Sequence, residues 1–166
     1  MAQIRPARED DAERLAQAEY ETSAGQEGLL VARPYEIPVE AFRRKITSLR
    51  SDGLYVVMES DGLPVGHLLL EPLDLSSTSH VFQLTIVVHP GQTGQGHGKA
   101  LIRYAIEWAR RSDRVEKIEL RVRSTNPTAI ALYESFGFVR EGELKKRVKL
   151  IQGYADDICM ALFVDE

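Results

Sequence analysis

The chain has 166 residues, a length typical of one domain, and its 21 Lys and Arg against 25 Asp and Glu give a formal net charge of −4. This mild acidic excess, without basic clusters, argues against a protein that binds a nucleic-acid backbone. No apolar run approaches the ~20 residues of a membrane span, and residues 1–10 are too charged for a secretory signal. The single cysteine, Cys159, cannot form an internal disulfide, which fits the reducing cytoplasm.

The N-terminal part of the chain reads as a short strand followed by two helices. Residues 3–5 are predicted as the strand, and apolar residues at helical spacing predict helices over 10–20 and 39–49. Glycines and prolines interrupt residues 21–38, so we expect a loop or a broken helix there.

The rest of the chain is rich in strands. The predicted strands cover residues 54–59, 65–70, 81–88, 117–122, 139–150 and 157–164. Of two further predicted helices, one ends near residue 112 and the other covers residues 127–136. The segment 81–88 is almost continuously apolar, as expected of a central strand buried on both faces. The order βαα-βββ-α-β-α-ββ implies an α+β or mixed α/β sheet with helices on its faces. No linker divides the chain, so we expect a single domain over residues 1–166.

Glycines occupy positions 94, 96 and 98, between the predicted buried strand and the amphipathic helix that follows it. Glycine allows positive φ and removes side chains, so backbone N–H groups can approach a diphosphate, toward which the helix also directs its positive end. A flexible strand-to-helix connection is the alternative, which three alternating glycines leading straight into a helix disfavour. The segment fits neither a P-loop, because Ala100 follows Lys99, nor a Rossmann fingerprint, because its spacing is G-x-G-x-G deep in the chain.

A second segment, residues 126–138, begins with Asn126-Pro127, a good N-cap followed by proline at the first helical position. Gly137 is expected to cap the C-terminus of this helix. The residues expected on its buried stripe are Ala129, Leu132, Tyr133 and Phe136. Capping and packing explain most of the segment, but Asn126 is the only asparagine in the chain, and a buried Tyr133 hydroxyl needs a partner.

Both segments resemble blocks of the GNAT superfamily of N-acetyltransferases. The acetyl-CoA loop of that family, R/Q-x-x-G-x-G/A, is similar to Thr93-Gly94-Gln95-Gly96-His97-Gly98, with Thr93 where the family normally has Arg or Gln. The next block, N-x-x-A-x-x-L-Y-x-x-x-G-F, is similar to residues 126–138, and the resemblance extends over residues 54–162. It implies a GNAT-like fold, with a central, mostly antiparallel twisted sheet of about seven strands and about four helices on its faces.

The resemblance also implies roles for particular residues, with acetyl-CoA as cosubstrate. Tyr133 and Asn126 are the predicted catalytic residues: Tyr133 would donate a proton to the departing CoA thiolate, and Asn126 would lie beside the pantetheine arm. The strand 86–88 would offer backbone groups to that arm and an N–H to the acetyl oxygen. The predicted acetyl-CoA-binding residues are Ile86, Val87, Val88, Thr93, Gly94, Gln95, Gly96, His97, Gly98, Lys99, Asn126 and Tyr133.

The expected reaction is direct acetyl transfer to a primary amine of a small molecule, a polyamine or a protein. An acyl-enzyme is not expected, because Cys159 reads as a small core residue. A protonated amine needs a base, and the strand 82–87 carries no carboxylate; Glu27, Glu71 and Glu119 are the candidates, with a water chain as an equal alternative. A protein that binds acetyl-CoA but has lost catalysis is the alternative function.

Three further expectations concern the rest of the surface. The histidines at 67, 80, 89 and 97 lack the i, i+4 spacing of a zinc site, so no metal is expected. The basic run of Lys145, Lys146, Arg147 and Lys149 is expected on an exposed strand face, with contact to the CoA 3′-phosphate or to an acidic partner as the alternative. Residues 21–38 and the last hairpin are expected to shape the acceptor pocket. No nucleic-acid or membrane partner is expected, and family habit suggests a homodimer.

Overall fold

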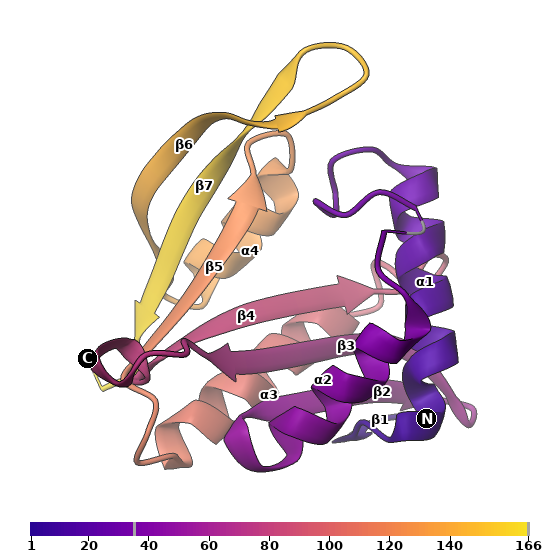
Figure 1. The fold of residues 1–166 in the computed structure, drawn as a ribbon, viewed down its shortest axis with the longest axis vertical. Coiled ribbons are helices and arrows are strands. Elements are labelled where there is room, and N and C mark those ends of the chain that lie inside the picture. The colour runs from indigo at the N-terminus through magenta and orange to yellow at the C-terminus, as the bar shows by residue number, and fades with distance from the viewer. Residues whose placement is uncertain (35, 166) are drawn as a thin grey trace.

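The computed structural model describes residues 1–34 and 36–165, which form one seven-stranded sheet flanked by helices (Figure 1). The strands are β1 (Ala2–Pro6), β2 (Leu54–Ser60), β3 (Leu63–Pro72), β4 (Val81–Val88), β5 (Lys117–Arg123), β6 (Val139–Lys149) and β7 (Tyr154–Phe163). Their order in the sheet is β1-β2-β3-β4-β5-β7-β6, and every adjacent pair is antiparallel except β4 and β5. The predicted mixed, mostly antiparallel sheet is confirmed.

Four α-helices cover the sheet in the described part of the chain. They are α1 (Ala12–Gly25), α2 (Val39–Asp52), α3 (His97–Arg111) and α4 (Pro127–Ser135). α1 is longer than predicted and ends at Gly25 rather than residue 20. The Thr22 hydroxyl donates to the Ala18 carbonyl at 2.8 Å, so this polar side chain is satisfied inside the helix and does not interrupt it. None of the helices in the part of the chain described is long and apolar enough to span a membrane.

The two faces of the sheet have separate cores. On one face, α1 and α2 pack against β2 and β3, with Leu15 and Ile46 fully enclosed beside Leu69. On the other face, α3 and α4 cover a larger core that contains Leu68 and Leu101. Neighbouring residues such as Leu68 and Leu69 belong to different cores because successive side chains of a strand point to opposite faces.

α4 is turned slightly from its predicted orientation. It buries Ile130 and Tyr133, whereas the rest of the predicted stripe, namely Ala129, Leu132 and Phe136, is half-buried at the margin of the core. Gly137 ends the helix with a φ of +96°, which confirms its predicted capping role.

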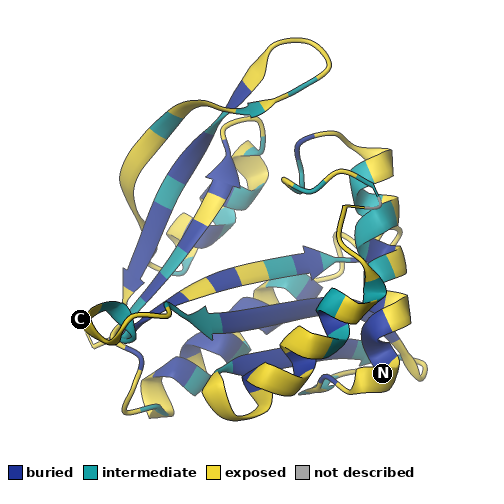
Figure 2. Cartoon of the chain, viewed as in Figure 1, coloured by how far each residue is buried: buried dark blue, intermediate teal, exposed yellow. Residues whose placement is uncertain are grey.

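β4 is not buried on both faces, and that prediction is wrong. Gln83 and Thr85 are exposed, whereas Phe82 and Leu84 on the opposite face are buried (Figure 2). The reason is that α1 and α2 pack on β2 and β3 and leave the same face of β4 and β5 uncovered. An apolar strand therefore still contributes a polar stripe to an open part of the sheet.

Candidate active site

β4 and β5 run side by side for only a short distance and then diverge. Their residue pairs are Val81 with Lys117, Phe82 with Ile118 and Gln83 with Glu119. Because β3 holds β4 and β7 holds β5 along most of their lengths, the two halves of the sheet open like a V beyond Gln83 (Figure 1). The divergence leaves an unpaired edge on each strand at the centre of the sheet.

The unpaired edge of β4 presents the backbone of alternate residues. His89 N–H donates to the Val65 carbonyl at 2.9 Å, so the odd-numbered residues of β4 direct their N–H and C=O groups toward β3 and the even-numbered ones toward β5. Ile86 and Val88 therefore direct backbone groups into the opening. Val87 directs its backbone groups toward β3, and its side chain is buried. Of the three residues of this strand predicted to bind acetyl-CoA, only Ile86 and Val88 therefore present backbone groups to the opening.

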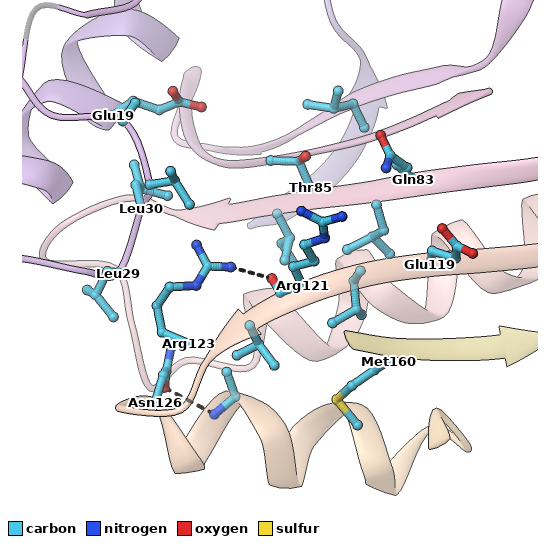
Figure 3. A pocket seen from close by; sticks show the side chains of 18 of the residues that line it. Glu19, Leu29, Leu30, Gln83, Thr85, Glu119, Arg121, Arg123, Asn126 and Met160 are labelled. Carbon is cyan, nitrogen blue, oxygen red and sulfur yellow. Dashed lines mark hydrogen bonds between the residues drawn. The ribbon is translucent and has the colours of Figure 1, made fainter. Parts of the chain in front are cut away.

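A cleft of about 640 Å³ occupies this opening and the uncovered face of the sheet (Figure 3). β4 and β5 contribute its floor, and residues 29–32 and Ile37 contribute part of its wall. The segment between α1 and α2 is tied to the β6–β7 hairpin, because Arg33 donates to the Lys149 carbonyl at 3.3 Å and Glu27 accepts the Ile151 N–H at 2.8 Å. The two segments expected to shape the pocket thus meet beside it, and both line it, the hairpin through Glu141, Cys159 and Met160.

Tyr133 lines the cleft from α4 and is 8% exposed. Its ring meets Phe138 edge-on, with 5.7 Å between the ring centroids. Burial raises the pKa of the phenol to about 12, so the hydroxyl stays protonated at neutral pH. No residue in the described ranges pairs with this hydroxyl, which leaves it available to a ligand.

Asn126 caps α4 and also borders the cleft. Its Oδ1 accepts the Ala129 N–H at 3.2 Å, as its position before Pro127 predicts, while its NH₂ group makes no bond to a described residue (Figure 3). The cap therefore uses only one end of the amide. The other end is free to donate to a group in the cleft.

Arg123 supports the edge of β5 beside Asn126. Its guanidinium Nη2 donates to the Arg121 carbonyl at 2.7 Å, an oxygen that would accept a bond from a β4 N–H in a continuous sheet (Figure 3). Its Nε lies 2.7 Å from Asp157 Oδ1, and this contact is an ion pair whose N–H does not point along it as a hydrogen bond would. Arg123 is 7% exposed, so the open edge is stabilised by a buried charge with a counter-charge.

The glycine loop joins β4 to α3 as predicted, but its glycines differ. Gly94 and Gly96 have φ angles of +76° and +84°, a conformation that other residues rarely adopt, whereas Gly98 lies inside α3 without positive φ. The first helical amide with a backbone acceptor is Ala100 N–H, which donates to the Gly96 carbonyl at 3.1 Å. The α3 amides before it have no acceptor among the described residues, as an anion-binding helix N-terminus requires. Nearby, His97 Nε2 is buried without a partner in the described chain.

Three hydrogen-bonded side chains that the sequence did not predict, Glu19, His67 and His89, form a row that reaches the cleft at Glu19 on α1. Glu19 lines the cleft, and its Oε1 lies 3.1 Å from His67 Nε2. His67 Nδ1 lies 2.9 Å from His89 Nε2, and His89 Nδ1 lies 3.2 Å from the Pro64 carbonyl. His67 and His89 are 0% and 1% exposed, so only Glu19 faces the solvent of the cleft.

The sequence matches the Acetyltransferase (GNAT) family over residues 11–138. The chain belongs to the GNAT acetyltransferase family. It is 32% identical over 143 residues to N-alpha-acetyltransferase RimI of Mycobacterium tuberculosis, which covers 86% of this chain and 81% of that protein. It is 37% identical over 101 residues to L-amino acid N-acetyltransferase AaaT of Escherichia coli, with coverage of 61% and 62%.

The fold is shared with solved GNAT structures. The structure of yncA from Salmonella typhimurium with its cofactor acetyl-CoA superposes with a TM-score of 0.90 at 18% identity, over 100% of this chain and 95% of that one. The GNAT-like fold expected from the resemblance is therefore confirmed. This GNAT chain is an acetyl-CoA-dependent N-acetyltransferase.

The cleft of this GNAT protein brings together three of the predicted site residues, Ile86, Asn126 and Tyr133. Val88 and the loop residues 93–99 do not line it, and lie where β4 ends and leads into α3. Val88 and the glycine loop, both predicted to bind acetyl-CoA, therefore lie next to the cleft rather than in its wall.

The three predicted general bases, Glu27, Glu71 and Glu119, lie in different surroundings. Only Glu119 lines the cleft, and Lys117 holds it at 2.9 Å. Glu71 pairs with Lys45 at 3.3 Å, and Glu27 is used in the contact with the hairpin, so neither lines the cleft.

Cys159 and Arg121 also differ from what the sequence suggested. Cys159, predicted in the core, is half-buried and lines the cleft. Arg121 was not singled out, although the alternation of polar and apolar residues along 117–123 indicates a strand with one polar face. Glu19, His67 and His89 gave no local signal, because the register of β3 against β4 brings the two histidines together and Glu19 reaches His67 from α1.

Proposed function

We propose that the cleft transfers the acetyl group of acetyl-CoA directly to a primary amine, with Tyr133 and Asn126 beside the CoA arm and Ile86 at the reacting carbonyl. The opening between β4 and β5 carries this proposal, because it places free backbone groups opposite a buried, protonated phenol in one cleft. When bound, acetyl-CoA supplies an activated acetyl group. The protein binds and orients it and moves the protons.

Backbone N–H groups hold the two ends of the cosubstrate in this proposal. The free amides of residues 94–99, together with the N-terminus of α3, bind the pyrophosphate. At the other end, the edge of β4 offers the Ile86 and Val88 groups to the pantetheine arm and to the acetyl oxygen, where negative charge develops during transfer. Because these donors are main-chain groups, Thr93 in place of Arg or Gln weakens CoA binding without abolishing it.

Glu19 is the proton acceptor of the proposed mechanism. It is the carboxylate of the cleft whose partner, His67, is an ionisable ring rather than a permanent cation, whereas Glu119 is held by Lys117. His67 is paired with Val87 in the sheet, which supports a position for Glu19 near the C-terminal half of β4. The N–H bond of the incoming ammonium breaks, and its proton passes to the Glu19–His67 pair.

The acceptor is a primary amine in this proposal. RimI and AaaT are named for acetylating an α-amine and an L-amino acid, respectively. A primary amine with a pKa of ~10.4 is protonated at neutral pH, so the acidic side chains in the cleft favour its entry in the charged form. The candidate acceptors are the primary amines of small molecules, polyamines and proteins.

The proposal is tested by mixing the protein with acetyl-CoA and a panel of amines and measuring free thiol. Amine-dependent thiol release is the expected result. Tyr133→Phe should lower turnover while leaving CoA affinity nearly unchanged, with Tyr104→Phe as a control, because Tyr104 is a half-buried tyrosine on α3 outside the cleft. Binding of CoA without amine-dependent release would instead identify a non-catalytic acetyl-CoA-binding protein.

The setting of the reaction is proposed as a cytoplasmic homodimer without a metal, nucleic-acid or membrane partner. The free thiol of Cys159 supports a reducing cytoplasm, and the net charge of −4 argues against a nucleic-acid partner. Light scattering after size-exclusion chromatography measures the oligomeric state. Full activity after dialysis against a chelator is the expected result for metal independence.

A further inference from the structure

Arg121 places a cation without a counter-charge on the floor of the cleft. It is exposed on β5, lines the cleft, and extends from β5 toward β4 (Figure 3). Its guanidinium makes no ion pair, hydrogen bond or ring contact with any residue in 1–34 or 36–165. The planar fork of an arginine is well matched to a carboxylate, which it binds through two parallel hydrogen bonds.

The other charged side chains that line the cleft all have partners. Lys45 lies 3.3 Å from Glu71, Arg123 lies 2.7 Å from Asp157, Glu19 lies 3.1 Å from His67, and Lys117 lies 2.9 Å from both Glu119 and Glu141. Arg121 is thus the exception among the charges of the described cleft. A ligand, rather than the protein, is left to supply its counter-charge.

The wall above this floor carries an apolar patch. Leu29, Leu30 and Ile37 line the cleft from the segment between α1 and α2, and Phe42 lines it from α2. Leu30 and Leu29 lie on the opposite side of the cleft from β5 in Figure 3. A ligand that meets both surfaces needs an anionic group at one end and an apolar group at the other.

We infer that Arg121 binds a carboxylate of the acceptor, so that the acceptor is a free α-amino acid with an apolar side chain. This inference rests on the proposed function and adds the substrate class to it. The carboxylate pairs with Arg121, the apolar side chain meets the wall formed by residues 29–30, Ile37 and Phe42, and the amine is left to face the acetyl group and Glu19.

The alternatives fit the same surfaces less well. A polyamine would bring further positive charge against an unpaired guanidinium. A protein N-terminus has an amide where a free amino acid has its carboxylate, and so leaves Arg121 without a counter-charge. The phosphates of CoA have the amides of residues 94–99, which lie outside the cleft that Arg121 lines.

Three matched sets of acceptors test the inference. Leucine, methionine and phenylalanine are compared with their amides and with isoamylamine, 3-(methylthio)propylamine and phenethylamine, and with spermidine and an alanine-initiated peptide. The expected kcat/KM is at least ten times higher for each free acid than for its amide or decarboxylated amine. Equal rates across a set, or a preference for spermidine or the peptide, would overturn the inference.

Substitution of Arg121 separates carboxylate binding from a structural role. Arg121→Gln should lower kcat/KM for the free acids at least tenfold, mainly through KM, and leave the rates with the decarboxylated amines and the affinity for CoA unchanged. Arg121→Lys should fall between, because lysine keeps the charge but loses the fork. Arg110→Gln is the control, since Arg110 is exposed on α3 outside the cleft. A uniform loss with every amine would contradict the assignment.

A binding measurement keeps this test independent of turnover. Calorimetry of the CoA-loaded protein should show leucine, methionine or phenylalanine binding, with the corresponding amide at least tenfold weaker and the difference abolished in Arg121→Gln. If no acceptor releases thiol but this difference is found, the proposed catalysis fails and the carboxylate site stands. If thiol is released equally from acids and amides, catalysis stands and the carboxylate site fails.

Discussion

His67 and His89 share a hydrogen bond of 2.9 Å, although they lie 22 positions apart in the chain. Burial, and then the neighbouring His67 ring, lowers the pKa of His89 to about 3, so His89 is neutral at pH 7. Its Nδ1 faces the Pro64 carbonyl and must carry the hydrogen, which makes Nε2 an acceptor for His67 Nδ1–H. His67 Nε2 then carries no hydrogen and faces Glu19 Oε1, so a proton taken up by this pair completes the contact between them.

The pKa of His89 makes stability depend on pH. Between the ~6.5 of an unfolded histidine and the folded value of about 3, the unfolded chain binds a proton that the folded protein does not. Stability therefore falls as the pH falls through this window. His89→Gln should remove up to about 1.4 kcal/mol per pH unit from the slope of the unfolding free energy.

Urea unfolding at pH steps from 7 to 4 measures that slope. The groups that face His89 are His67 on β3, the Pro64 carbonyl, Arg14 on α1 and, through His67, Glu19. His80→Gln is the matched control, because His80 is half-buried in a loop outside this chain of contacts. Equal slopes in the wild type and His89→Gln would show that His89 is protonated in the folded protein.

Glu19→Gln should lower kcat at neutral pH by about 10²-fold, the usual contribution of a general base. The loss should shrink as the pH approaches ~10.4, where a primary amine deprotonates without help. Glu119→Gln is the matched control: it removes another carboxylate of the same cleft, but one already held by Lys117, and should change kcat little. A pH-independent loss in Glu19→Gln would assign Glu19 a structural role only.

The sequence predicted those parts of the site whose chemistry is local. The helix cap at Asn126 and the left-handed turn at Gly96 were predictable from a few neighbouring residues, and the structure has both. The pairing of His67 with His89 and the exposure of Thr85 were not predictable in this way. The first depends on strand register, and the second depends on how far α1 and α2 extend over the sheet.

Gly96 and Gly98 should respond differently to alanine. Gly96 has a φ of +84°, so Gly96→Ala should cost about 1–2 kcal/mol and raise the KM for acetyl-CoA. Gly98 is helical, and its added Cβ would meet Val88 Cγ2 at an ordinary 3.6 Å, so Gly98→Ala should be neutral or stabilise by up to about 1 kcal/mol. Unfolding and KM are measured for both; equal effects would mean that positive φ is not what the loop requires.

Asn126 offers a way to separate capping from ligand binding. Asn126→Asp keeps an oxygen for the Ala129 N–H and should leave stability nearly unchanged, whereas Asn126→Ala should cost about 1 kcal/mol. Both variants lose the NH₂ group that faces the cleft, so both should raise the KM for acetyl-CoA. A wild-type KM in Asn126→Asp would limit Asn126 to its structural role.

Tyr133 should shape the magnitude of the rate but not its pH profile. With a pKa raised by burial to about 12, the phenol remains protonated to at least pH 10, so its ionisation should produce no fall in kcat/KM between pH 7 and 10. That pKa also exceeds the ~8.5 of a thiol, so the phenol stabilises the departing thiolate chiefly as a hydrogen-bond donor rather than by leaving a lasting phenolate. Tyr133→Phe should therefore lower kcat about 10²-fold at every pH in this range, with an unchanged profile and with Tyr104→Phe as control. A basic limb below pH 10 that disappears in Tyr133→Phe would show instead that the cleft exposes the phenol to solvent and lowers its pKa.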